Sequence, residues 1–370
     1  MERVVYILGA GFSRPLGIPT MREFMDVARD MHFAPNSEYS HFANVFEGLS
    51  GMNAASRFVK LDRENIEHVL SFLEMEYRST GEESERISQF RIFIRDVIVK
   101  NTPSFDLPVG RRGENADIHT DRIFSAKSFS AAARSSDLRD PYFRFVCSIT
   151  NVCRTGPRLC PVTAVDRDMG DGFTHYSVLT LNYDQVLESS FNAVRTLLIT
   201  DRIPNRVRLV TDANCNARFL IHQPQVIHLH GDVSDVNSLV APTFTKPVDS
   251  FIEAKWKTAY ELIRDANHIR FIGYSLPDGD QYLQYLISSA LGSVKNLKRI
   301  DVICLDSSEG EVKKRFDKFF TPGRYWFMNT TTEEYLGALR AVSLRTPGQE
   351  EVGSWIDLER QHLDFMRSNS

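Results

Sequence analysis

Apolar residues along this chain fall into two alternating patterns. Short, largely apolar runs predict strands buried on both faces, as in a parallel sheet; they occur at 4–8, 177–181, 226–229, 268–272 and 299–305. After Gly172 these runs alternate with stretches of helical periodicity, at 184–198, 251–266, 280–291 and 311–319. Alternating strands and helices predict an α/β fold, a Rossmann-like parallel sheet with helices on both faces.

Residues 31–171 lack this alternation. Their apolar residues recur mainly at helical spacing, over 64–77, 87–99 and 143–152. The stretch 101–140 is rich in Ser, Gly, Arg and Asp, and we expect a long, mobile loop there. The block therefore predicts a helical domain inserted into the α/β domain.

We expect the chain to divide into three parts. A discontinuous Rossmann-like NAD-binding domain takes 1–30 and 172–345, and the helical insert takes 31–171. Residues 346–370 are expected to hold a last amphipathic helix with Trp355 on its apolar side. The arrangement is one interrupted sheet domain and not a series of domains.

The composition of the chain argues against two classes of partner, nucleic acids and membranes. Of 370 residues, 44 are basic and 48 acidic, so the net charge of −4 argues against direct nucleic-acid binding as the main theme. No apolar run reaches the roughly 20 residues that span a bilayer, and the apolar N-terminal stretch is too short for a signal peptide. We expect a cytoplasmic protein with no membrane partner.

The five cysteines form no CxxC pair, which argues against a zinc ribbon and predicts free thiols in a reducing compartment. No metal site is expected.

The first predicted strand runs directly into Gly9-Ala10-Gly11. Such a loop lets the backbone approach a pyrophosphate. The alternative is that the glycines are needed only for the turn from strand to helix. The dehydrogenase fingerprint would place a third glycine at position 14, where the chain has Arg14. A hydride-transfer enzyme is therefore disfavoured, and the GxxxxGK[ST] phosphate loop is missing too.

Four motifs in order resemble those of the sirtuin superfamily. Each stands at the predicted carboxyl end of a strand, where ligands bind in open α/β sheets. They are Gly9-Ala10-Gly11-Phe12-Ser13 with Gly17-Ile18-Pro19 and Arg22, then Thr180-Leu181-Asn182-Tyr183-Asp184, then His228-Leu229-His230-Gly231-Asp232, and Gly273-Tyr274-Ser275-Leu276. The resemblance covers 1–30 and about 175–310. It implies a site for NAD.

The chain departs from the sirtuin deacylases because it lacks their two CxxC pairs, so no zinc is expected. The stretches 65–70 and 273–280 resemble instead the sirtuin-like NAD hydrolases of bacterial anti-phage defence. That branch implies an NAD glycohydrolase that releases nicotinamide and ADP-ribose. It also implies a homo-oligomer and, as a possible partner, a separate HerA-type ATPase. The alternatives are an NAD-dependent protein deacylase and a non-catalytic assembly subunit that binds NAD or ADP-ribose.

The resemblance points to three catalytic candidates. His230 follows a strand and can exchange a proton near neutral pH, although a lone histidine there could merely cap a loop. Asn182 and Asp184 begin a helix, and a helix cap explains one of them but not both. Asn182 can bind a ribose hydroxyl or orient a water, and Asp184 can support it. On an ideal strand His228 points to the same side as His230.

The binding candidates belong to the same motifs. The first motif is expected to hold the pyrophosphate, through Gly9, Ala10, Gly11, Ser13 and Arg22. The later motifs are expected to contact the rest of NAD, through Gly231, Gly273 and Ser275.

Overall fold

The computed structural model describes most of the chain. The described residues are 2–52, 62–81, 85–107, 123–124, 137–155, 158–162, 174–198, 206–211, 220–241, 250–345 and 351–368. Much of the loop expected at 101–140 lies outside them.

The central feature is a parallel sheet. Within the described residues it has seven strands, in the order β5 (Val210–Thr211), β6 (Gln225–His228), β4 (His175–Thr180), β1 (Arg3–Leu8), β7 (His268–Ile272), β8 (Arg299–Cys304) and β9 (Trp326–Asn329). All neighbouring strands run parallel. The strand order reverses at β1, which lies between β4 and β7. The predicted Rossmann-like α/β fold is confirmed.

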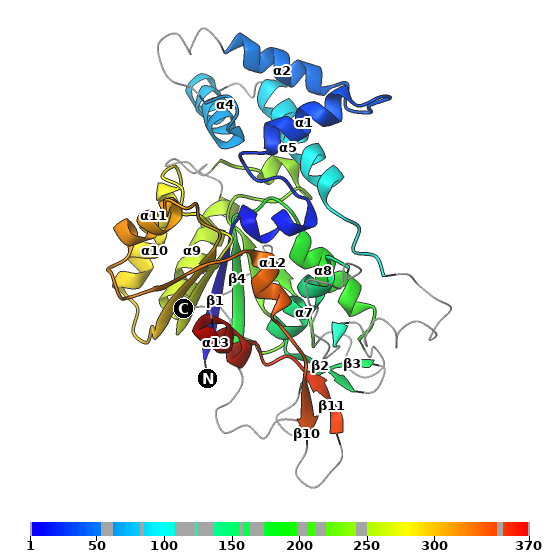
Figure 1. Ribbon diagram of the computed structural model, residues 1–370. Coiled ribbons are helices and arrows are strands. Elements are labelled where there is room, and N and C mark those ends of the chain that lie inside the picture. The colour runs from blue at the N-terminus through cyan, green and yellow to red at the C-terminus, as the bar shows by residue number, and fades with distance from the viewer. Residues whose placement is uncertain are drawn as a thin grey trace.

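Helices cover both faces of the sheet (Figure 1). One face packs on the side of Val4 and Tyr6, with α7 (Asp140–Ile149), α8 (Val186–Arg195), α12 (Thr332–Gly337) and α13 (Leu358–Ser368). The other packs on the side of Val5 and Ile7, with α9 (Ser250–Arg264), α10 (Gln281–Gly292) and α11 (Glu311–Phe319). Because successive strand residues point to opposite faces, the apolar run of β1 contributes to both cores.

A separate helical unit sits beyond the carboxyl ends of the strands (Figure 1). It comprises α1 (Phe24–Phe33), α2 (Phe42–Gly51), α4 (Ile66–Thr80) and α5 (Glu85–Asn101). Its apolar core also takes in Tyr183, Leu239 and Ala241 from loops at the sheet edge. The N–H of Ala241 donates to the buried Glu74 of α4 (3.2 Å). The unit is thus fixed over the edge where a ligand site is expected.

Two sequence expectations need correction. Helix α7 falls inside 31–171 but packs against α8 on the sheet, so this part of the segment joins the sheet domain. The helix expected at 143–152 is present as α7 but ends at Ile149, and β2 (Val152–Thr155) follows it. The helix expected in 346–370 begins only at Leu358, so Trp355 lies on β11 (Glu351–Trp355) and not on that helix. These strands form a four-stranded antiparallel sheet, within the described residues, with β3 (Arg158–Pro161) and β10 (Val342–Arg345). Each strand is too short to show a period of its own, and β2 and β11 are paired across some 200 residues of sequence.

No helix among the described residues combines the length and apolar character needed to cross a membrane.

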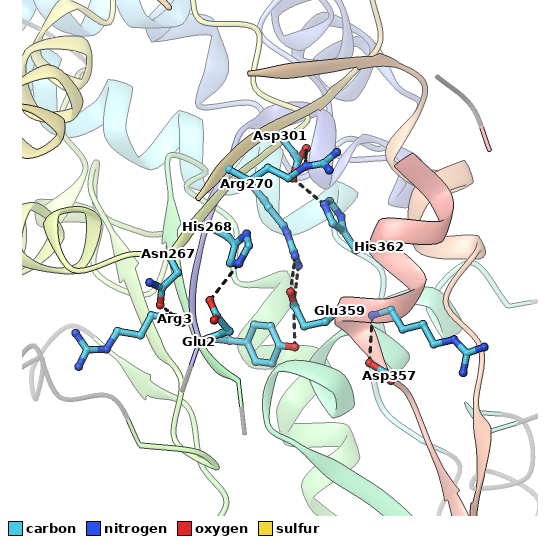
Figure 2. Close-up of polar contacts among 12 residues, drawn as sticks. Glu2, Arg3, Asn267, His268, Arg270, Asp301, Asp357, Glu359 and His362 are labelled. Atoms are coloured by element: carbon cyan, nitrogen blue, oxygen red, sulfur yellow. Dashed lines mark hydrogen bonds and ion pairs between the residues drawn. The ribbon is translucent and has the colours of Figure 1, made fainter. Parts of the chain in front are cut away.

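The C-terminal helix α13 is held to the sheet by buried polar contacts (Figure 2). Arg270 of β7, 1% exposed, forms a two-pronged ion pair with Glu359 of α13 (2.9 and 2.6 Å). Arg270 also donates to the hydroxyl of Tyr6 on β1 (2.8 Å). One turn further along α13, His362 lies 3.0 Å from Asp301 of β8. These contacts give α13 a fixed position that its apolar stripe alone would not specify.

Removing the charge of Glu359 should destabilise the fold. Glu359→Gln leaves the buried Arg270 guanidinium without an anion, and we expect the free energy of unfolding to fall by about 2–4 kcal/mol. Urea unfolding followed by circular dichroism measures this. Arg360→Gln, on the exposed side of the same helix, is the matched control and should change it by less than about 0.5 kcal/mol. Equal effects of the two substitutions would contradict a buried ion pair.

His362 should make stability depend on pH. Burial lowers its pKa to about 4, so it stays neutral, accepting from the Tyr335 hydroxyl and donating to Asp301. Between pH ~6.5 and ~4 the unfolded chain binds a proton there and the folded chain does not, so stability falls as the pH falls. His362→Gln should reduce the slope of unfolding free energy against pH in that window. An unchanged slope would show that His362 titrates normally.

Candidate active site

The glycine loop lies where the strand order reverses. Leaving β1, the N–H of Gly9 donates to the carbonyl of Ile272 (3.1 Å), and that of Gly11 donates to the carbonyl of Gly273 (2.9 Å). A Cβ atom on Gly9 would lie 2.7 Å from the Gly273 carbonyl oxygen, and one on Gly273 would lie 2.3 Å from the Phe12 nitrogen. Gly273 also has φ of +62°. The glycines are therefore required for the close approach of two backbones.

This packing changes how the loop can serve a phosphate. The amides of Gly9 and Gly11 are directed at β7, and those of Phe12 and Ser13 donate within the loop. Ala10 is exposed at the tip, as is Arg22 shortly before α1. Of the residues predicted to bind the pyrophosphate, these two are exposed to solvent.

Asn182 connects this loop to β4. It is 8% exposed, and its side-chain amide donates to the carbonyl of Gly9 (3.0 Å) and to the hydroxyl of Ser13 (3.3 Å). Its own backbone N–H donates to the Thr180 hydroxyl at the end of β4 (3.1 Å). With both contacts made through the amide nitrogen, the side-chain carbonyl oxygen of Asn182 is the atom that can accept from a ligand or water.

Asp184 is connected to the same loop through Ser13. One carboxylate oxygen accepts the N–H of Val186, the first residue of α8 (3.1 Å), in an Asx turn just before the helix, whose N-cap is Gln185. Burial raises the pKa of the Asp184 carboxyl, while a hydrogen bond from Ser13 opposes the rise. Asn182, Ser13 and Asp184 thus form one buried hydrogen-bonded chain.

The two histidines have different surroundings. Strand β6 ends at His228, whose ring bonds with the carbonyl of Asn182 (3.2 Å) and with Glu188 of α8 (3.0 Å). His230 lies in the turn that follows, with its ring centroid 6.3 Å from Trp256 of α9 and 6.5 Å from Tyr183. The geometry of an ideal strand does not apply to this pair, because β6 ends before His230. Their rings approach helices on opposite faces of the sheet.

The remaining predicted residues lie on neighbouring loops. Gly231 has φ of +80°, and a Cβ there would lie 2.0 Å from the carbonyl oxygen of Ser238 in the 3₁₀ turn η4 (Val236–Ser238). Ser275 follows β7, and its carbonyl accepts from Arg315 of α11 (2.8 Å). The loop after β6 is joined to that after β4, because the N–H of Val233 donates to the carbonyl of Tyr183 (2.9 Å).

Sequence reasoning missed two residues of this region. Glu188 holds His228, and Trp256 flanks His230. Glu188 stands four residues after Asp184, a spacing that places both on one side of a helix, which could have indicated it. The position of Trp256 depends on how α9 packs, and no sequence signal reports that.

No group of three or more His, Cys, Asp or Glu side chains that could hold a metal ion occurs among the described residues.

Residues 176–320 match the model of a family described as the SIR2-like domain. The match runs from β4 to α11 and bears out the predicted resemblance to the sirtuin superfamily. No curated protein matches the chain. One similar solved structure is that of Sir2 in complex with an inhibitor, 2'-O-acetyl-ADP-ribose and a deacetylated p53 peptide. It is 13% identical, with 90% of each chain covered and a TM-score of 0.30.

The close backbone approach predicts the effect of a single methyl group. Gly273→Ala should lower the free energy of unfolding by at least about 2 kcal/mol, because it adds both a strained φ and a contact of 2.3 Å with the Phe12 nitrogen. Gly279→Ala, on the same β7–α10 loop, has open space and is the control, with an expected change within about 1 kcal/mol. Chemical unfolding of both variants checks this. Equal stability would mean that the two loops are not in contact.

Proposed function

We propose that the protein is an NAD glycohydrolase, which cleaves NAD to nicotinamide and ADP-ribose. The observation that carries the proposal is the bridge from Asn182 to Gly9 and Ser13, with His230 nearby, at the strand reversal of a SIR2-like domain. Ligands of open α/β sheets bind at such a reversal. NAD is the substrate in this proposal, and no zinc is invoked.

The reaction needs little covalent chemistry from the protein. Breaking the bond between nicotinamide and ribose leaves positive character on the ribose, which water must then attack. A site that holds the dinucleotide, positions the water and excludes bulk solvent suffices. We expect the helical unit, which lies beyond the carboxyl ends of the strands (Figure 1), to provide the exclusion.

The candidate residues have distinct roles in this reaction. Asn182 is held rigidly through its amide nitrogen, so its carbonyl oxygen offers a fixed acceptor to a ribose hydroxyl or to the water. His230, buried between Tyr183 and Trp256, is proposed to take up the proton. Asp184 and Ser13 act as positioning residues for Asn182. The exposed Arg22 and the Ala10 amide are proposed to meet the pyrophosphate.

The proposal predicts loss of NAD turnover on removal of either polar group. Asn182→Ala and His230→Ala should each lower the rate of nicotinamide release by roughly 100-fold or more. Chromatography of the products, with circular dichroism to confirm folding, measures this. Asn44→Ala and His41→Ala, both on the exposed surface of α2 or its start, are the matched controls and should retain full rates.

Full activity in folded Asn182→Ala and His230→Ala would overturn the site assignment. NAD-dependent removal of acetyl from an acetylated peptide, with no hydrolysis of NAD alone, would favour the deacylase alternative. Tight NAD binding without turnover would favour a binding subunit.

An enzyme that depletes NAD must be controlled, and we propose a role as an effector of anti-phage defence. The homo-oligomer and the separate HerA-type ATPase stay predictions from the resemblance to the defence branch. Assaying NAD turnover with and without co-expressed neighbouring proteins tests them together.

A further inference from the structure

Two cysteines face each other across the small antiparallel sheet. Cys153 of β2 and Cys160 of β3 are directly opposite in the strand register, and their sulfur atoms lie 3.3 Å apart. Opposed residues of an antiparallel pair have Cα atoms about 4.5–5.5 Å apart, which is within the range of about 4.4–6.8 Å that disulfides span. The backbone already has the separation that a disulfide needs.

The two thiols differ in exposure and in partners. Cys153 is 1% exposed, and its sulfur donates to the carbonyl of Cys160 (3.5 Å). Cys160 is half-buried, and its sulfur lies 3.2 Å from the hydroxyl of Thr155. A hydroxyl donor at that distance stabilises a thiolate. Cys160 is therefore suited to react first and Cys153 to follow.

The other described cysteines lack this arrangement. Cys147 is buried in α7 within the main core, and Cys304 is buried at the end of β8. Burial raises the pKa of the Cys147 thiol, and raises that of Cys304 to about 12. Neither forms a thiolate readily, so both are expected to be slow with oxidants.

We propose that Cys153 and Cys160 form a reversible dithiol–disulfide site whose oxidant is a hydroperoxide. The Cys160 thiolate attacks the terminal oxygen of the hydroperoxide, and the O–O bond breaks. The remaining oxygen leaves as an alkoxide, or as hydroxide from hydrogen peroxide, and takes up the proton that the Cys160 thiol lost, which gives the alcohol or water. Cys160 then carries a sulfenic acid. The Cys153 sulfur attacks the Cys160 sulfur, the S–O bond breaks, and water leaves with the Cys153 proton. Two thiols and one hydroperoxide thus yield one disulfide, one alcohol or water, and one water.

The site would tie β2 to β3 at the place where β2 meets β11. Trp355 of β11 pairs with Cys153 in register and packs on the cysteine pair. Strand β11 leads directly into α13, which carries Glu359 and His362. Oxidation would therefore constrain β2, which pairs with β11, and β11 leads to the helix that packs on the main sheet.

The test uses the full chain with Cys215→Ser, since Cys215 lies outside the described residues. Treatment with hydrogen peroxide should lower the intact mass by two hydrogen atoms, and dithiothreitol should restore it. Digestion should place the link between the peptides that contain Cys153 and Cys160. Cys153→Ser should stop the link and leave a sulfenic acid on Cys160 that a cyclic 1,3-dione traps. Thr155→Val should slow the reaction several-fold, and Cys304→Ser should leave it unchanged.

Three results would overturn the inference. They are a link that joins two copies of the chain, dione trapping on Cys147 or Cys304 as fast as on Cys160, and a folded chain whose Cys153 and Cys160 stay reduced after peroxide has oxidised its methionines. The outcome does not depend on NAD turnover, so it stands apart from the proposed glycohydrolase.

Discussion

The contact between Gly9, Gly11 and Gly273 determines the geometry of everything above the sheet. Hydrogen bonds from the first two glycines to the end of β7 leave no space for a side chain between the backbones. Because the loop is drawn against β7, its Gly9 carbonyl and Ser13 hydroxyl turn toward β4, where Asn182 meets both. Three parallel strands that are far apart in sequence are thereby joined at their carboxyl ends.

The same contact explains why a glycine motif is ambiguous from sequence. The expectation that Gly9 and Gly11 bind a pyrophosphate treats their amides as donors to a ligand, whereas they donate to Ile272 at the end of β7 and to Gly273 just after it. Their structural role is complete without a ligand, so their presence supports a ligand site less than that of Asn182 does. Asn182 is buried at a cost in desolvation and side-chain entropy that Gly9 and Ser13 offset, and it still has an acceptor atom to offer.

Features of the fold that depend on interactions between residues close in sequence could be predicted, and those that depend on residues far apart in sequence could not. Strand β1 was predictable because an apolar run such as Val4–Leu8 carries its own signal of burial on both faces. The motifs at Asn182 and Gly273 were found because they follow such strands directly. The small sheet was not predictable, since β2 and β11 pair across a long stretch of chain and neither is stable alone. The rings of His228 and His230 lie on opposite faces because β6 ends at His228. A sequence pattern does not locate the end of a strand to the single residue.

The buried contacts of α13 and the glycine contact share one strand. Arg270 and Ile272 both belong to β7, two residues apart, and therefore point to the same face of the sheet. The ion pair with Glu359 fixes Arg270 from that face, while Phe271 is packed from the other by α11. A strand held on both faces cannot shift its register, and the carbonyls of Ile272 and Gly273 that receive the glycine loop are the next groups along it. The C-terminal helix, though distant from Asn182, thus helps to set the position of the loop on which Asn182 depends.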